Sequence, residues 1–234
     1  MSRLRALVAP LGRTPLHPQW LLGGRKPPPG VGLISGRVLD VGAGDRWIAT
    51  HLAHDADYVA LDYPTTGRDM YRARPDVFAD AAHLPFADGV FDAVICLEVL
   101  EHVPDPQRVL DEISRVLRSG GVVWLSMPFL YPIHDAPHDY QRFTLHGLKR
   151  SVQNCGLSLS EVDKTLHALR TAGLLASLGV SGAVQGAARW QWPILLPLAA
   201  VAVVSINLAS WLASWVWPDW DALTAGYMLK AVKP

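Results

Sequence analysis

Short apolar segments alternate with amphipathic ones through the middle of the chain. Five segments have the length and composition of β-strands, at residues 37–42, 57–62, 76–79, 91–97 and 121–128. The segment FDAVICL, at 91–97, is apolar at almost every position, which is typical of a parallel strand covered on both faces.

Helical spacing separates some of these strands. Residues 105–117, DPQRVLDEISRVL, repeat apolar side chains along one helix face, and Asp105 and Pro106 suit the N-cap and first-turn positions. A shorter helical segment is predicted near 45–53. Strands and helices alternating at such short intervals predict right-handed βαβ units in a doubly wound α/β sheet.

The two ends of the chain differ from this pattern. Residues 1–35 form a lead-in, with a short helix predicted at 2–8 and a Pro/Gly linker at 23–32. Residues 36–234 are predicted to form one domain that is interrupted by an apolar insertion at 167–223.

Composition excludes some classes of protein. Lys+Arg and Asp+Glu balance at 21 each, and the arginines are spread along the chain, unlike the clustered basic charge of a nucleic-acid-binding protein. Two cysteines, Cys96 and Cys155, are too few for a disulfide framework and favour a reducing cytoplasmic setting.

The first strand runs into a glycine turn, VLDVGAGD, at 38–45. Gly42 and Gly44 can adopt unusual φ angles and allow a ligand to approach the backbone closely. Asp62 ends the second strand, where its carboxylate can accept hydrogen bonds from ribose hydroxyls. A nicotinamide dinucleotide stays compatible with both features, although the dinucleotide fingerprint breaks after Gly44, where Asp45 and Arg46 follow and the third glycine is missing.

The stretch DAAHLPFADGVFDAVICLEVLEHV, at 80–103, favours a different cofactor. With the glycine turn and Asp62, it resembles the class I S-adenosylmethionine-dependent methyltransferases of the type 11 group, over residues 36–160. The resemblance implies a Rossmann-like seven-stranded sheet with an antiparallel last strand, and S-adenosylmethionine as cofactor. It assigns these residues to the cofactor site: Asp40, Gly42, Ala43, Gly44, Asp62, Tyr63, Asp80, Ala81, Glu98 and His102.

Each of these acidic residues also has a purely structural interpretation. Asp62 and Asp80 are compatible with ordinary strand-end caps. Glu98 and Glu101 are compatible with a solvated helix start, and His102 with a helix cap.

A loop rich in aromatic residues, histidine and aspartate follows the fifth strand at 127–144. Open α/β sheets bind their ligands at this rim, and a small subgroup of the same methyltransferases looks similar here. The residues predicted to meet the acceptor are Phe129, Tyr131, Asp139, Tyr140 and Arg142.

Three interpretations of this loop stay open. His134 or His138 is a general base in a substrate lid. Alternatively, Arg142 pairs with Asp139 or Asp135 to order the loop, and Thr144 caps the next helix. The third interpretation is a metal site made by His134, Asp135, His138 and Asp139. We predict no metal, because the two histidines flank a proline and an aligned acceptor needs none.

Residues 157–166 and 224–234 suit the sixth and seventh strands that the resemblance implies, and the insertion separates them. Its run at 190–218 has no charged residue, is long enough to cross a hydrocarbon core of about 30 Å, and carries tryptophans towards both ends. A single crossing would place the seventh strand on the opposite side of the membrane from the rest of its sheet, and two crossings would translocate Arg189. We expect a shallow membrane hairpin with contact through 171–218; a buried hairpin or a homodimer interface is the alternative.

These features predict an S-adenosylmethionine-dependent methyltransferase on the cytoplasmic side of a membrane. Its acceptor is a lipid-linked sugar, a polyprenyl or quinone-like lipid, or a small polar molecule. The alternative is a non-catalytic S-adenosylmethionine-binding scaffold or sensor that is recruited to membranes.

Overall fold

The computed structural model describes residues 12–67 and 74–234, and the chain divides into two compact units. The α/β unit comprises Lys26–Phe129, Ile133–Asp163 and Gly226–Pro234. The hairpin unit comprises the described residues up to Arg25, together with Leu130–Pro132 and Lys164–Ala225. The helix expected at 2–8 lies outside the described residues, and the division at residue 35 stays a prediction.

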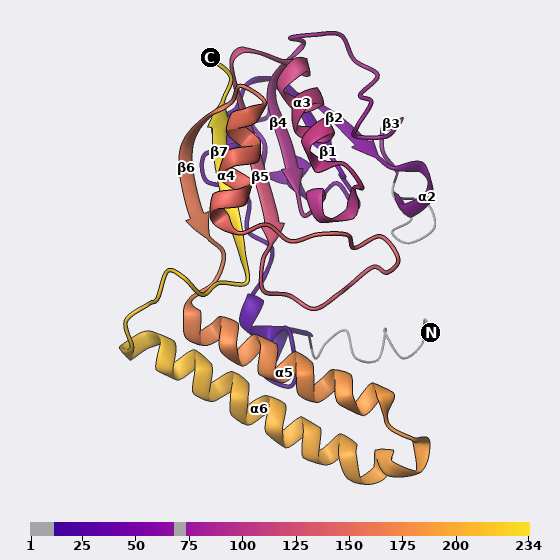
Figure 1. Ribbon diagram of the computed structural model, residues 1–234, viewed down its shortest axis with the longest axis vertical. Coiled ribbons are helices and arrows are strands. Elements are labelled where there is room, and N and C mark those ends of the chain that lie inside the picture. The colour runs from indigo at the N-terminus through magenta and orange to yellow at the C-terminus, as the bar shows by residue number, and fades with distance from the viewer. Residues whose placement is uncertain (1–11, 68–73) are drawn as a thin grey trace. The chain divides into compact units, whose positions relative to one another are not determined.

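Seven strands of the α/β unit form one sheet in the order β3-β2-β1-β4-β5-β7-β6 (Figure 1). The first five strands are parallel, and β7 is antiparallel to β5. The predicted Rossmann-like sheet with an antiparallel last strand is therefore confirmed. The strands are β1 Gly36–Val41, β2 Ala56–Asp62, β3 Val77–Phe78, β4 Phe91–Leu97, β5 Leu117–Pro128, β6 Ser158–Lys164 and β7 Gly226–Val232.

Helical segments cover both faces of this sheet. One face packs against α3, whose apolar stripe is fully buried, and α4. The other face packs against two 3-10 segments, η3 and η4, through Val31 and Ile48. The helical segments of the unit are η3 Val31–Leu33, η4 Trp47–His51, α2 Pro64–Thr66, η6 Leu100–His102, α3 Pro106–Val116 and α4 Leu145–Asn154.

The helical segment predicted near 45–53 is present as the 3-10 helix η4. Arg46, which precedes it, has φ of 60°, in the left-handed region. An α-helix cannot pass through a left-handed residue, so only the short turn after Arg46 remains helical.

Strand β7 shows the predicted alternation. Tyr227, Leu229 and Ala231 are buried, whereas the intervening residues are partly exposed. Leu229 lies opposite Leu125 in the register with β5, so the C-terminal strand contributes directly to the core.

The hairpin unit is built on two long helices, α5 Ala168–Gly186 and α6 Trp192–Val216, joined through η7 Arg189–Gln191 (Figure 1). The helices approach closely at Gly173, where an added Cβ would lie 2.1 Å from Oγ of Ser210. The insertion between the sixth and seventh strands is therefore helical, as predicted.

Buried polar groups fix the inner side of this hairpin. Ser177 Oγ donates to Oδ1 of Asn207 at 2.9 Å, and Nδ2 of Asn207 donates to the carbonyls of Pro15 and His17 at 2.7 and 3.0 Å. All the polar atoms of the Asn207 amide are thus engaged, which a buried amide requires.

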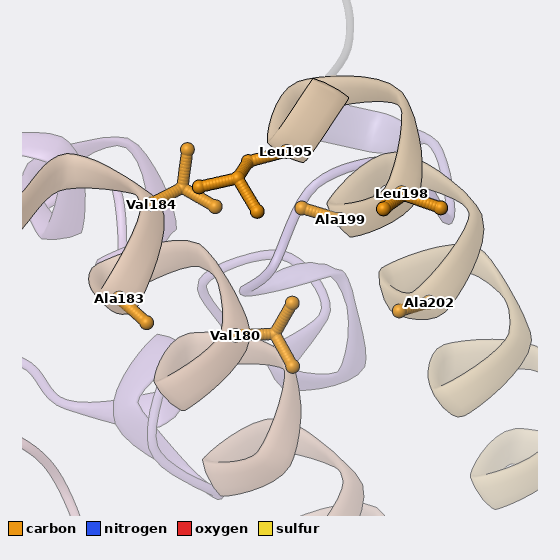
Figure 2. Close-up of a pocket in the computed structure, with 7 residues that line it drawn as sticks. All are labelled: Val180, Ala183, Val184, Leu195, Leu198, Ala199 and Ala202. Atoms are coloured by element: carbon orange, nitrogen blue, oxygen red, sulfur yellow. The ribbon is translucent and has the colours of Figure 1, made fainter. Parts of the chain in front are cut away.

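The outer side of α6 is apolar and exposed. Arg189–Val216 is long and apolar enough to cross a membrane by length and composition, and only 11% of its most apolar window is buried. A recess of about 340 Å³ between the two helices is lined entirely by apolar residues, Val180, Ala183, Val184, Leu195, Leu198, Ala199 and Ala202 (Figure 2).

Candidate functional site

The glycine turn follows β1 at the carboxyl edge of the sheet. Gly42 has φ of 74°, and a Cβ added there would lie 2.4 Å from Cγ2 of Val99, so both conformation and space require glycine. Gly44 has φ of 50° and faces open space. The backbone N–H groups of Gly42 and Ala43 donate to the carbonyl of Leu61 at 2.9 and 3.0 Å, which holds the turn against β2.

Asp62 joins the turn to the end of β2. Its Oδ2 accepts the N–H of Gly44 at 2.9 Å, and its Oδ1 accepts the N–H of Tyr63 at 2.8 Å. Burial raises the pKa of Asp62, and the two backbone donors partly offset that rise. Tyr63 itself is exposed. Asp62 is thus an ordered carboxylate at the carboxyl end of β2, beside β1, where a ribose is expected.

Asp40 lies deeper in the sheet. Its Oδ2 accepts the Tyr58 hydroxyl at 2.6 Å, and burial raises the pKa of Asp40 to about 7. The same burial, together with Asp40, raises the pKa of Tyr58. Asp40 is only 5% exposed, so its carboxyl group lies in the protein interior, next to the start of the glycine turn.

Replacement of Asp40 by asparagine is expected to stabilise the protein at alkaline pH. The pKa of Asp40 is about 7 in the folded chain and ordinarily 3.8, so the folded state holds the extra proton between these values. The stabilisation of the folded state by this proton is complete below pH 4 and is lost as pH rises to 7. The difference in the free energy of unfolding between Asp40→Asn and the wild type should shift in favour of the variant by about 2–4 kcal/mol when the pH is raised from 4 to 8.

Denaturant unfolding without cofactor at both pH values measures this effect. Tyr58→Phe is the matched control. Loss of the Tyr58 hydroxyl should raise the pKa of Asp40, so the stabilisation by the Asp40 proton should persist to a higher pH in this variant than in the wild type. An Asp40→Asn variant whose difference from wild type does not change with pH would contradict this account.

Two of the residues predicted for the cofactor site, Asp80 and Ala81, follow β3. Asp80 is exposed, and its Oδ1 accepts the N–H of Ala82 at 2.9 Å; Ala81 is buried against the core. The carbonyl of Asp62 accepts the N–H of Ala79 at 3.1 Å, which brings the two strand ends together.

Glu98 follows β4 with a left-handed backbone, φ of 55°. Ser126, on β5, donates its hydroxyl to Oε1 of Glu98 at 2.7 Å, and the N–H of Glu98 donates to the Ser126 carbonyl at 3.1 Å. A left-handed non-glycine residue is uncommon and costly, so these contacts hold Glu98 in an unfavourable backbone conformation at the strand end.

Glu101 does not belong to a solvated helix start. It is 0% exposed, and burial followed by the nearby Glu98 charge raises its pKa to about 9. Beside it, Nδ1 of His102 lies 2.7 Å from the His138 carbonyl, and burial lowers the pKa of His102. The solvated interpretation is therefore wrong for Glu101.

The loop after β5 is ordered mainly by Asp139. Its carboxylate accepts both terminal nitrogens of Arg142 and the N–H of His134, and these contacts hold the pKa of Asp139 well below its usual range. Thr144 Oγ1 accepts the N–H of Gly147 and caps α4. The Arg142–Asp139 pairing and the Thr144 cap were both predicted.

The other loop residues are divided between the two units. Tyr140 donates its N–H to the carbonyl of Glu101 at 2.8 Å, and its hydroxyl lies 3.3 Å from Nδ1 of His138. Phe129 packs against Tyr227 in the sheet core. Tyr131 belongs to the hairpin unit, where its hydroxyl accepts Nε2 of Gln19, so the five predicted acceptor residues do not gather in one unit.

Comparison with known proteins relates the strands that carry this site to a protein family. Residues 39–125, from β1 to β5, match a family model described as a methyltransferase domain. Over these residues, the resemblance to the class I S-adenosylmethionine-dependent methyltransferases is confirmed. This methyltransferase domain carries its glycine turn, strand-end acids and Glu98 at the carboxyl edge, the edge where doubly wound sheets bind cofactors.

Curated relatives match part of the chain, and solved structures share its fold. The ubiquinone biosynthesis O-methyltransferase of Pectobacterium atrosepticum is 35% identical over 105 residues, covering 41% of this chain and 44% of that protein. The cyclase SpnF is 19% identical with a TM-score of 0.53, covering 87% of this chain and 77% of its own. Phosphoethanolamine N-methyltransferase 2 of Haemonchus contortus, solved with S-adenosylhomocysteine, is 17% identical with a TM-score of 0.50, covering 91% and 50%.

The match to the curated relatives is partial. The alignment spans less than half the length of the Pectobacterium atrosepticum enzyme. The family model ends at residue 125, before the apolar hairpin of this chain begins. The matched part is therefore the segment that carries the glycine turn and the strand-end acids, without the hairpin.

Proposed function

We propose that this chain is an enzyme that transfers a methyl group from S-adenosylmethionine to an acceptor presented at a membrane surface. The observation that carries the first part is the ordered turn at Gly42 and Gly44, fixed by the Asp62 carboxylate, in a domain of this family. Both cysteines are free thiols, which favours the cytoplasmic side of the membrane.

Each residue has a distinct part in holding the cofactor. Gly44 leaves the turn open to the methionine portion, and Asp62 offers carboxylate oxygens to the ribose hydroxyls. Glu98, exposed at the end of β4 and fixed by Ser126, offers a negative charge to the cationic sulfonium. Bound S-adenosylmethionine supplies an electrophilic methyl group, so alignment of the acceptor supplies most of the catalysis.

The apolar hairpin supports a membrane-proximal acceptor. Most large apolar side chains on α6 are exposed, and Trp190, Trp192, Trp215, Trp217 and Trp220 are exposed near its two ends. Exposed apolar patches of this kind mark membrane or protein interaction surfaces, and tryptophan favours the membrane interface. A polyprenyl or quinone-like lipid, or a lipid-linked sugar, is the class of acceptor that fits best.

A shallow position in one leaflet suits the polar network of the hairpin. Asn207 and Ser177 bind each other on its inner side, and Asn207 also binds the carbonyls of Pro15 and His17. The hairpin thus has one apolar side for lipid and one side covered by the described part of the N-terminal segment. A homodimer through the same apolar side is the competing arrangement.

Calorimetric titration of the detergent-purified chain with S-adenosylhomocysteine tests the first part of the proposal. Binding in the micromolar range is expected, followed by donor turnover when a membrane extract supplies the acceptor. Binding without turnover would favour the scaffold or sensor, and tighter binding of NADH than of S-adenosylhomocysteine would overturn the cofactor assignment.

A further inference from the structure

An apolar recess lies at the closed end of the hairpin, where α5 and α6 are joined. Residues in the last two turns of α5 and the first three turns of α6 line it, among them Val184 and Leu195 (Figure 2). Its volume of about 340 Å³ is more than twice that of an engineered apolar cavity of about 150 Å³ that binds benzene. The recess therefore has room for a segment of a hydrocarbon chain.

Small aliphatic side chains create this recess. Every lining residue is alanine, valine or leucine, and the alanines leave space that larger side chains would fill: Ala183 on α5, and Ala199 and Ala202 on α6. Water gains no hydrogen bond from such side chains, and apolar cavities of this kind stay dry or bind apolar molecules. An apolar ligand is therefore favoured over water at this position.

A single cation lies in the turn that joins the two helices beside the recess. Arg189, in η7, is the only charged residue from Thr171 to Pro218, and it is exposed. No carboxylate of the described residues forms an ion pair with its guanidinium. The backbone around Arg189 is fixed, because the Trp192 indole donates to the carbonyl of Ala187 at 3.3 Å.

The negative charges of the hairpin unit lie at its other end. Among the described residues of that unit, the carboxylates are those of Asp219 and Asp221, and both pair with Nζ of Lys164, at 2.5 and 2.9 Å. The length of α6, about 35 Å at about 1.5 Å per residue, separates them from the turn. The turn thus presents a positive charge with no competing anion nearby.

One kind of ligand satisfies both the recess and the cation. A phosphate group suits the arginine guanidinium, which binds its oxygens through two parallel hydrogen bonds, and a hydrocarbon chain suits the recess. A free phosphate would leave the recess unfilled, and a neutral hydrocarbon would leave Arg189 unpaired. Trp190, which is 76% exposed, and Trp192 flank the same turn, and tryptophan favours the level of the lipid headgroups.

We propose that the turn and the recess bind one anionic phospholipid, with its phosphate on Arg189 and part of an acyl chain in the recess. The proposal rests on the membrane contact of the proposed function and adds the class of lipid that the hairpin selects. It also places the closed end of the hairpin at headgroup depth, because an arginine keeps its charged group out of the hydrocarbon.

Vesicle co-sedimentation of the full chain tests the role of Arg189. Phosphatidylcholine vesicles are compared with vesicles in which about a third of the lipid is phosphatidylglycerol. Arg189→Ala should weaken binding to the anionic vesicles about fivefold, because one basic residue near an anionic surface contributes about that much. Its binding to pure phosphatidylcholine should not change, and Arg189→Lys should lose less because it keeps the charge.

Arg150→Ala is the matched control for the charge. Arg150 is an exposed arginine on α4, in the α/β unit, so its loss should leave binding to both kinds of vesicle unchanged.

Phosphatidylglycerol with a photoactivatable acyl chain tests the recess. Peptide mapping should find the cross-links mainly on the lining residues of α5 and α6. Ala199→Phe should remove most of them, because the added ring occupies the recess while its surface stays apolar. Ala209→Phe is the matched control, since it adds the same ring to an exposed position of α6 outside the recess. Circular dichroism and thermal unfolding show that each variant is folded.

Four outcomes would overturn the proposal: an equal effect of Arg189→Ala on both kinds of vesicle, cross-links spread evenly along the exposed side of α6, recess cross-links that survive Ala199→Phe, or a second copy of the chain covering the recess. Vesicle binding without preference for anionic lipid would leave the proposed function standing. Absence of vesicle binding by the wild type would remove the membrane contact as well, and the S-adenosylhomocysteine titration does not depend on either result.

Discussion

Replacement of Asp62 by alanine is expected to lower the affinity for S-adenosylhomocysteine at least tenfold. A hydrogen bond to a charged group contributes about 1.5–3 kcal/mol, and about 1.4 kcal/mol is a factor of ten. The substitution also removes the acceptor that holds the N–H of Gly44 at 2.9 Å, so the glycine turn loses its link to β2. Isothermal titration calorimetry of the purified chain measures the change directly.

Two further variants separate binding from folding. Asp57→Ala makes the same substitution at the other, exposed end of β2, and it should leave the affinity unchanged. Asp62→Asn keeps the size and one oxygen acceptor, so it should fall between wild type and Asp62→Ala. Unchanged affinity in a folded Asp62→Ala protein would refute the ribose assignment.

Substitution of Val201 and Leu212 by serine is expected to weaken binding to lipid vesicles at least tenfold. These side chains on α6 are 67% and 59% exposed, so the change removes apolar surface without opening a cavity. Complete burial of a side chain of this size contributes about 1.5–3 kcal/mol, and partial insertion of two such groups still exceeds a factor of ten. Vesicle co-sedimentation across a range of lipid concentrations gives the partition coefficients.

Leu33→Ser with Ile133→Ser is the matched control for the hairpin. Both side chains are more exposed than those of Val201 and Leu212. They belong to the α/β unit, so replacing them should not change vesicle binding. Size-exclusion chromatography of all variants tests the competing arrangement. A wild-type dimer that dissociates in the Val201/Leu212 variant, with no vesicle binding by either protein, would identify the apolar side as a homodimer interface.

Most of the sheet was predictable because its signals are local. The run FDAVICL is buried at nearly every position in β4, and the alternation in 226–232 matches the buried and exposed sides of β7. The segment near 45–53 was not predictable as a 3-10 helix, because its apolar spacing does not reveal that Arg46 adopts a left-handed backbone. The left-handed backbone of Arg46 makes the helical segment start only at Trp47.

The candidate site divides in the same way. Gly42 and Asp62 follow strand ends, so their positions could be inferred from the topology alone, and Arg142 could be paired with Asp139 because they are three residues apart. Glu101 could not be placed, because a charged residue near a strand end is ordinarily solvated. Its burial depends on a loop more than thirty residues further along the chain, whose Tyr140 binds the Glu101 carbonyl.

The position of β7 within the sheet dictates an order of events during translation. β7 lies between β5 and β6, yet the ribosome makes it after both helices of the hairpin. Until Gly226–Val232 emerges, β6 has no neighbouring strand and the edge of β5 is unpaired, while α5 and α6 are already synthesised. An unpaired edge favours aggregation, so the incomplete sheet is exposed to this risk throughout the synthesis of the hairpin, until its last strand has been made.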